Sequence, residues 1–102
     1  MSSTESNPLY TDNWQQFLQL LQQAMTDNCQ QELLQLLLTP DERLVLATRV
    51  KIIEELLKGQ LSQRQLKDQL GVGIATITRG SNGLKTAPEA FIGWLSTHLL
   101  VE

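Results

Sequence analysis

The sequence predicts an all-α protein of six helices in one folded unit. Apolar residues recur at helical spacing along most of the 102 residues. Proline and capping residues that start helices, and glycines that stop them, stand between these stretches. The chain has no internal repeat, low-complexity segment or linker that would divide it into separate domains.

The first helix is expected to follow a polar arm. Residues 1–9 show no apolar pattern, and we expect them to be disordered. Thr11 is placed to cap a helix that ends near Thr26, and residues 10–102 are expected to form a single domain. The apolar stripe of this helix consists of Trp14, Phe17, Leu18, Leu21 and Met25. Such a stripe indicates packing in a core or a dimer.

Capping signals predict the second and third helices. Asn28 with Gln31 reads as a capping box, and the leucine-rich run behind it predicts a short, buried helix. The run TPDE at 39–42 combines a threonine N-cap, a proline at the first helical position and the glutamate of a capping box. A long helix is expected from there to Lys58, where Gly59 stops it. Its expected apolar stripe consists of Leu46, Val50, Ile53 and Leu57, with Ala47 beside it.

Residues 62–87 read as a helix, a tight glycine turn and a second helix. Ser62 and Gln65 form a further capping box, so the first of these helices starts near Gln63. Gly71 ends it, because glycine adopts the left-handed backbone without steric cost. The apolar residues at helical spacing are Leu66, Leu70, Ile74, Ile77 and Leu84. The second helix also carries short polar and cationic side chains, which suit a helix that reads base edges in a DNA major groove.

A last helix is expected to open at Pro88. Its apolar face consists of Phe91, Trp94, Leu95, His98 and Leu99. No serine, cysteine or carboxylate pairs with His98 in a recognisable motif, so we expect its ring to bond a carbonyl or a water molecule. The protein is therefore not expected to be an enzyme.

Composition predicts a homodimer outside the membrane. Twenty leucines among 102 residues present more apolar surface than one small core buries, so a second chain is expected to cover the remainder. A single cysteine, Cys29, excludes an internal disulfide framework, and a single histidine leaves no plausible metal site. The N-terminus lacks a basic start and an apolar stretch, so we expect a soluble, cytoplasmic protein with no membrane partner.

The net charge of −3 hides a local basic segment. Residues 1–40 carry −4, residues 41–58 are neutral and the tail after residue 85 carries −2. Residues 59–85 carry +3, from Arg64, Lys67, Arg79 and Lys85 against Asp68. A focused basic patch is sufficient for phosphate contacts, and an acidic remainder restrains non-specific binding.

The two runs TPDERLVLATRVKIIEELLKGQLSQRQLK, at 39–67, and GVGIATITRGSNGLK, at 71–85, closely resemble the tryptophan repressor family of bacteria. The resemblance is continuous from about Leu33 to Leu100 and weak over the residues before it. It implies an intertwined homodimer that binds double-stranded operator DNA through helix-turn-helix motifs. It also implies L-tryptophan as a corepressor ligand, with no cofactor.

The resemblance also supplies a tryptophan site. Arg79 matches the arginine that pairs with the carboxylate, and Arg49 matches the arginine that stacks on the indole. Thr39 matches a threonine that supports the carboxylate end, while the carbonyls of Leu36 and Leu38 from the other chain accept from the ammonium. The residues alone leave plainer roles open: an N-cap for Thr39, a solvated charge for Arg49 and a phosphate contact for Arg79.

Two glycines complete this expected site. Gly80 permits close approach to the indole edge, whereas Gly83 stands where the family pattern has serine, so a hydroxyl expected near the ammonium is missing. The four glycines at 71, 73, 80 and 83 also predict that the reading helix is the least stable element, because interior glycines such as Gly80 and Gly83 weaken a helix. A ligand that binds only the ordered, DNA-competent arrangement would then shift the population toward it.

The same comparison assigns DNA-binding residues. The matching positions are Gln63, Arg64 and Lys67 in the first helix of the motif and Ile74, Ala75, Thr76, Thr78, Asn82 and Lys85 in the second. The residues at the start of the second helix, Ile74 to Thr76, are expected to reach bases directly or through water. Lys67, Thr78 and Lys85 are expected to position the DNA backbone.

The sequence thus predicts a tryptophan-dependent repressor of tryptophan biosynthesis genes. One alternative is a helix-turn-helix DNA-binding protein without an effector, as in replication initiators, although the leucine-rich N-terminal helices, Thr39 and Arg49 argue against it. The other alternative is a helical protein-interaction module whose basic hairpin meets an acidic protein. Binding to DNA that ignores salt, or no binding at all, would favour that module.

Overall fold

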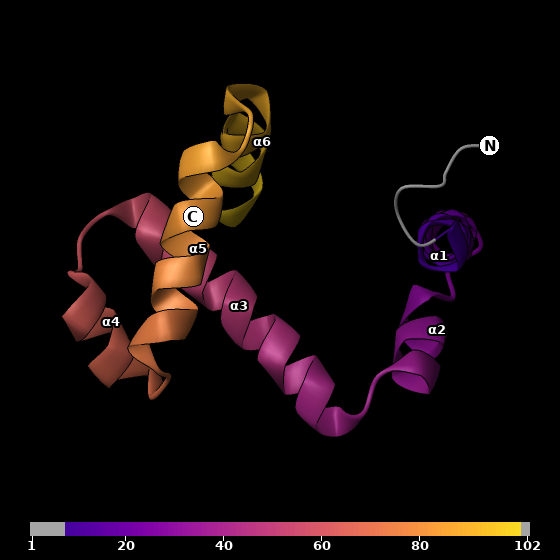
Figure 1. Ribbon diagram of the computed structural model, residues 1–102, viewed down its shortest axis with the longest axis horizontal. Coiled ribbons are helices and arrows are strands. Elements are labelled where there is room, and N and C mark those ends of the chain that lie inside the picture. The colour runs from indigo at the N-terminus through magenta and orange to yellow at the C-terminus, as the bar shows by residue number, and fades with distance from the viewer. Residues whose placement is uncertain (1–7, 101–102) are drawn as a thin grey trace. The chain divides into compact units, whose positions relative to one another are not determined.

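In the computed structural model, residues 8–100 are described, with side chains from Asp12 onward, and every regular element among them is a helix (Figure 1). The helices are α1 (Pro8–Thr26), α2 (Gln30–Leu37), α3 (Pro40–Lys58), α4 (Gln63–Leu70), α5 (Ile74–Thr86) and α6 (Glu89–Leu99). The predicted all-α class and the six helices are confirmed.

The chain divides into two compact units, and the boundary between Arg43 and Leu44 falls within α3. The first unit contains α1 and α2, and the second contains most of α3 with α4, α5 and α6. In the first unit the described part of α1 begins at Pro8, so Thr11 lies inside the helix and is not its N-cap. Proline suits a first helical turn, because no intrahelical acceptor waits for its missing N–H. Residues 8 and 9, which were expected in the disordered arm, are therefore helical, and the rest of that arm, residues 1–7, lies outside the described residues.

The turn between α1 and α2 corrects a second expectation. Asn28 has a φ of 64°, in the left-handed region. The N–H of Cys29 donates to the carbonyl of Ala24 at 2.8 Å, and the N–H of Asn28 donates to that of Met25 at 3.3 Å. This is a Schellman motif, so Asn28 ends α1 and does not cap α2. The N-cap of α2 is Cys29, which makes no side-chain cap bond.

The prediction that the second helix is buried is wrong within its own unit. None of the residues of α2 is buried, and the side chain of Leu36 is 81% exposed. Within the described part of this unit, Ala24 is the only buried apolar residue. Leu33 and Leu34 are half-buried within this unit, whereas Leu36 and Leu37 are exposed.

The start of α3 agrees with the sequence. The N–H of Glu42 donates to the Thr39 hydroxyl at 3.1 Å, and the N–H of Thr39 donates to the Glu42 carboxylate at 2.9 Å. These two bonds confirm the capping box, and Gly59, with a φ of 68°, confirms the stop. Lys51 bonds Glu54 at 3.3 Å and thereby holds the pKa of that carboxyl below its ordinary value. Such exposed pairs contribute little to stability.

The second unit has a small core between α3, α4 and α5. It consists of Ile52, Leu66 and Ile77, each no more than 1% exposed, with Leu56, Leu61, Leu70 and Val72 packed around it. The expected stripe of α3 is wrong in part, because Leu46 and Val50 are exposed and Ile52 is the residue that faces the core. Periodicity predicts the helix but not which of its apolar faces packs within one chain.

The helices α4 and α5 lie side by side and form the predicted helix, turn and helix (Figure 1). The capping box of Ser62 and Gln65 is present, with bonds of 3.1 and 2.8 Å, and Gly71 ends α4 at a φ of 69°. Leu66 and Ile77 hold the two helices together as core residues. The capping bonds and these core residues therefore fix the orientation of α4 relative to α5.

Helix α6 presents aromatic side chains to the surface. The rings of Phe91 and Trp94 stack with centroids 5.9 Å apart, and both side chains are exposed. His98 lies beside Trp94, and its Nδ1 is 2.8 Å from the Trp94 carbonyl oxygen, so the expected bond from the ring to a carbonyl is confirmed.

Candidate functional site

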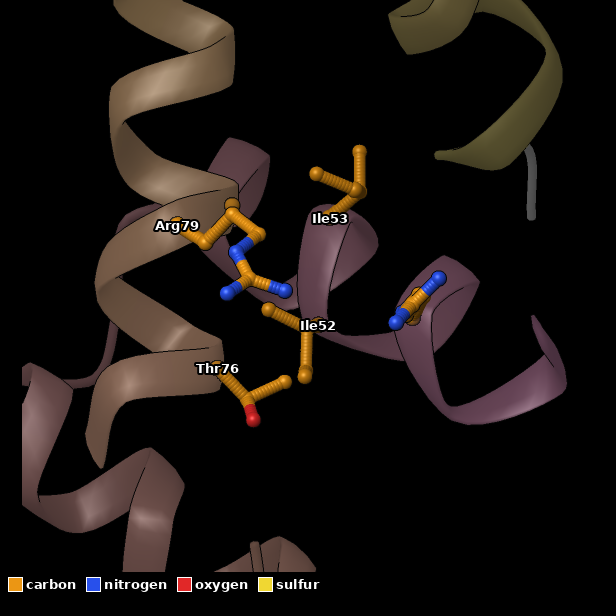
Figure 2. A pocket seen from close by; sticks show the side chains of 6 residues that line it. Ile52, Ile53, Thr76 and Arg79 are labelled. Carbon is orange, nitrogen blue, oxygen red and sulfur yellow. The ribbon is translucent and has the colours of Figure 1, made fainter. Parts of the chain in front are cut away.

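A pocket of about 140 Å³ lies between α3 and α5 (Figure 2). It is lined by Arg49, Ile52, Ile53, Thr76, Arg79 and Gly80. Three of these residues come from α3 and three from α5. The pocket brings together Arg49 and Arg79, which stand thirty positions apart in the sequence.

Helical spacing explains why these side chains share one wall. Arg49, Ile52 and Ile53 stand at i, i+3 and i+4 on α3. Thr76, Arg79 and Gly80 repeat the same spacing on α5. Each helix therefore turns one guanidinium and its neighbours toward the same space.

Gly80 sets how closely the two helices approach. A Cβ built at this position would lie 3.3 Å from Ile52 Cγ2 and 3.4 Å from Leu56 Cδ1. Those separations are tight, so the absence of a side chain brings α5 close to α3. The family resemblance implies a ligand role for Gly80, and the structure adds a role in helix packing.

The chemistry of the pocket suits a planar apolar group that carries an anion. Ile52 is buried and supplies an apolar floor, and Figure 2 shows Arg79 extending from α5 toward α3. Among the described residues neither Arg49 nor Arg79 forms an ion pair. A guanidinium can bind a carboxylate bidentately and can stack on an aromatic face.

The pocket is small for a complete ligand site, because such sites usually enclose about 300 to 1,000 Å³. It encloses about 140 Å³. A wall supplied from outside these two helices would be needed to enclose a drug-sized molecule.

A basic surface accompanies this pocket on the hairpin. A groove of about 500 Å³ is lined by Arg64, Lys67 and Asp68 of α4 and Ile74 of α5. Lys67 Nζ lies 3.7 Å from Asp68 Oδ1, a loose and exposed pairing that leaves the lysine able to turn toward an anion. The exposed members of the expected DNA-binding set are Gln63, Arg64, Ile74, Ala75, Thr78, Asn82 and Lys85, and its half-buried members are Lys67 and Thr76.

Thr76 belongs to both surfaces. It is one of the residues expected at the DNA, and it also lines the pocket beside Arg79. Ile52 and Ile53 are pocket residues that the sequence alone did not assign to a site. Their spacing from Arg49 was the available signal, because residues three and four positions apart lie on one face of a helix.

The match to a family model decides what kind of protein this is. The model described as Trp repressor protein matches residues 12–99. The chain belongs to the Trp repressor family. The match extends over most of both units and includes all of the site residues described above.

Individual Trp repressor relatives support the assignment. A Trp operon repressor homolog of Vibrio parahaemolyticus is 55% identical over 83 residues, which are 81% of this chain and 80% of that protein. The homolog of Vibrio cholerae is 58% identical over 76 residues, 74% of each chain. The homolog of Photobacterium profundum is 48% identical over 99 residues, 97% of this chain and 95% of that one.

The remaining positions expected from the Trp repressor resemblance are not among the residues that line the pocket. Leu36 is exposed on α2, and Thr39 is engaged in its capping box. The carbonyl of Leu38 accepts a hydrogen bond of 3.0 Å from Arg43 Nη1. Gly83 lies on α5, and a Cβ added there would meet no atom within 4 Å.

The described part of the chain offers neither a metal cluster nor a membrane span. No group of three or more histidine, cysteine, aspartate or glutamate side chains there could hold a metal ion. None of the helices that the structure describes has the length and apolar character needed to cross a bilayer.

Proposed function

We propose that this protein is a tryptophan-dependent transcriptional repressor that binds operator DNA as a homodimer. L-Tryptophan acts as its corepressor ligand, and the genes of tryptophan biosynthesis are its targets. The observation that carries the proposal is the double use of α5. This helix lines the pocket through Thr76, Arg79 and Gly80, and it carries the expected base-reading residues at its N-terminal end.

The pocket chemistry supports L-tryptophan as the ligand. Arg79 pairs with the carboxylate, and Arg49 stacks on the indole above the apolar floor of Ile52 and Ile53. A second chain completes the enclosure and contributes the carbonyls of Leu36 and Leu38 for the ammonium, with Thr39 near the carboxylate. Such an arrangement accounts for a pocket that is too small in one chain.

Ligand binding is coupled to DNA binding through the orientation of α5. A tryptophan that contacts Arg49 on α3 and Arg79 on α5 favours the arrangement in which both contacts form. If this arrangement also presents Ile74, Ala75 and Thr76 to the major groove, the ligand raises the population that can bind the operator. No cofactor or catalytic group takes part, and the protein acts in the cytoplasm.

The dimer is supported by the apolar surface of the chain. The exposed apolar side chains include Leu36 and Leu37 on α2 and Phe91 and Trp94 on α6. A two-fold dimer would bury them and would place two hairpins on successive half-sites of an operator.

A selection experiment tests the proposal. The protein is mixed with duplex fragments of genomic DNA at fixed salt, with and without L-tryptophan, and the retained fragments are sequenced. We expect a small set of fragments to be retained only when the amino acid is present. An Arg79→Ala variant should retain none of this set.

Other outcomes would contradict the proposal in distinguishable ways. Selective retention without the amino acid would indicate an effector-independent DNA-binding protein. Absence of retention at any salt concentration would favour a protein-interaction module.

A further inference from the structure

A side-chain hydrogen bond joins the two helices of the hairpin at their exposed edge. Thr78 Oγ1 of α5 donates to Gln63 Oε1 of α4 over 3.3 Å. The other side-chain hydrogen bonds between described residues join positions no more than five apart. This bond links positions fifteen apart, so it depends on how the two helices pack and not on the geometry of one helix.

The bond fixes which end of the Gln63 amide is available to a partner. Its oxygen accepts from the Thr78 hydroxyl, so the NH₂ group at the other end of the amide keeps both of its donors. Both side chains are exposed, so these donors can reach an acceptor in solution or on a ligand. Gln63 has three rotatable side-chain bonds, whereas β-branched Thr78 has one restricted bond.

We propose that Thr78 is a positioning residue that holds the Gln63 amide with its nitrogen toward a phosphate of the bound DNA. This inference rests on the proposed DNA-binding function and changes the role of Thr78 within it. The hydroxyl acts through Gln63 and does not itself contact the DNA backbone. Gln63 supplies the contact.

The backbones on both sides of the bond are held in place by other interactions. Gln63 follows Ser62, whose capping box anchors the start of α4. Thr78 follows Ile77, which is fully buried in the core of the hairpin. The bond therefore contributes little to the stability of the hairpin. Its effect is to order the flexible Gln63 amide before DNA binds.

Double-mutant binding measurements test the inference. The full-length protein with saturating L-tryptophan is titrated against its selected operator duplex and against an unrelated duplex. Thr78→Val removes the hydroxyl at nearly constant shape, and we expect binding to both duplexes to weaken by about two- to fivefold, a magnitude typical of one exposed hydrogen bond. Thr78→Ser should restore binding, because it restores the donor.

The decisive comparison uses a second background. In a Gln63→Met protein, which lacks the amide, Thr78→Val should have no further effect. An equal loss in both backgrounds would mean that the hydroxyl acts without Gln63, and the inference would be wrong. The slope of affinity against salt should stay unchanged in every variant, because no charge is removed.

Thr86→Val provides the matched control. Thr86 lies on the same helix, but its hydroxyl bonds the carbonyls of Asn82 and Gly83 within α5. Its replacement makes the same chemical change without touching α4. We expect this variant to bind DNA within about twofold of wild type. Any loss of helix stability from replacing threonine by valine should be small and should be similar in Thr78→Val and Thr86→Val.

A spectroscopic measurement in the free protein separates failure of the inference from failure of the proposed function. The side-chain amide of Gln63 is followed by its ¹⁵N relaxation in the absence of DNA. Thr78→Val should raise its mobility, and Thr86→Val should not. Unchanged mobility would overturn the inference even if operator binding is intact, while increased mobility would support the hydrogen bond even if the protein binds no DNA.

Discussion

Arg79 is the residue whose removal should affect the ligand most. Its side chain extends into the pocket between α3 and α5 (Figure 2). We expect Arg79→Ala to weaken L-tryptophan binding by about tenfold to a hundredfold, because a hydrogen-bonded charge pair contributes about 1.5 to 3 kcal/mol. Calorimetry with the purified protein measures this. Arg64→Ala makes the same charge change at the groove on α4 and should leave the heats intact.

Gly83 offers a test of where the ammonium lies. A side chain added there would meet no atom within 4 Å, so the chain has room for a serine. If the ammonium of L-tryptophan lies beside this position, Gly83→Ser should tighten its binding by up to about a hundredfold, since a charged hydrogen bond is worth about 1.5 to 3 kcal/mol.

The control for Gly83→Ser is a ligand without an ammonium. Indole-3-propionate keeps the ring and the carboxylate, so it should gain only from the stiffening of the helix, about 1 kcal/mol at most. Equal gains for the two ligands, or no gain for either, would remove Gly83 from the ammonium site.

At the scale of a helix, the two glycines of α5 should respond in opposite ways to alanine. Gly83→Ala fills open space and removes a glycine from a helix, so it should raise the free energy of unfolding by about 0.5 to 1 kcal/mol. Gly80→Ala should cancel this gain or reverse it, because its Cβ would lie 3.3 Å from Ile52 Cγ2. Thermal unfolding of both variants at one protein concentration measures the difference. Equal stabilisation by both would show that α5 does not pack tightly on α3 at Gly80.

The basic side chains of α4 and α5 should act on DNA without regard to sequence. Lys67→Met or Lys85→Met should weaken binding to all duplexes alike. Each should also lower the slope of log affinity against log salt by about one unit for every phosphate that the lysine neutralises in a half-site. Lys51→Met is the control, because Lys51 on α3 is paired with Glu54. A lysine variant with altered base preference and an unchanged slope would contradict the assigned role.

Helix boundaries could be predicted where the capping chemistry is local. The capping boxes at Thr39 and Ser62 and the left-handed glycines at positions 59 and 71 depend on neighbouring residues, and all are present. The prediction for Asn28 is wrong because asparagine suits both an N-cap and the left-handed end of a helix. Only the hydrogen bonds to the preceding turn reveal which role it has.

The site was predictable only in part. Arg49 and Arg79 came from the family resemblance, and their meeting in one pocket required the packing of α5 on α3. The role of Gly80 in that packing could not be read from the sequence, because it depends on the 3.3 Å separation from a side chain of another helix. The bond from Thr78 to Gln63 is likewise a product of the tertiary arrangement.

At the scale of the whole molecule, the apolar surface predicts obligate assembly. Within the described residues only Ala24, Ile52, Leu66 and Ile77 are buried apolar side chains. Because this buried core is small for a chain of 102 residues, we expect a second chain to bury further apolar surface. We therefore expect the stripe on α1 and the leucines of α2 to form dimer surface, which would account for the burial that the sequence predicted.

Assembly can be tested by the concentration dependence of stability. If folding and dimerisation are linked, each tenfold dilution should lower the free energy of unfolding by about 1.4 kcal/mol of dimer. Chemical denaturation over a hundredfold range of protein concentration, with light scattering of the native state, measures it. A midpoint that ignores concentration, with the mass of a monomer, would exclude the dimer.

The helix pairs α1 with α2 and α4 with α5 are each formed by neighbours in the sequence. Contacts between neighbouring segments need only short loops to close, and helical hairpins of this kind form within microseconds to milliseconds. Refolding after rapid dilution from denaturant should therefore begin with a fast phase whose rate ignores protein concentration. The second phase should slow as the protein is diluted, because two chains must collide before the exposed leucines find partners. The time needed to recover DNA-binding activity after unfolding would then depend on the protein concentration.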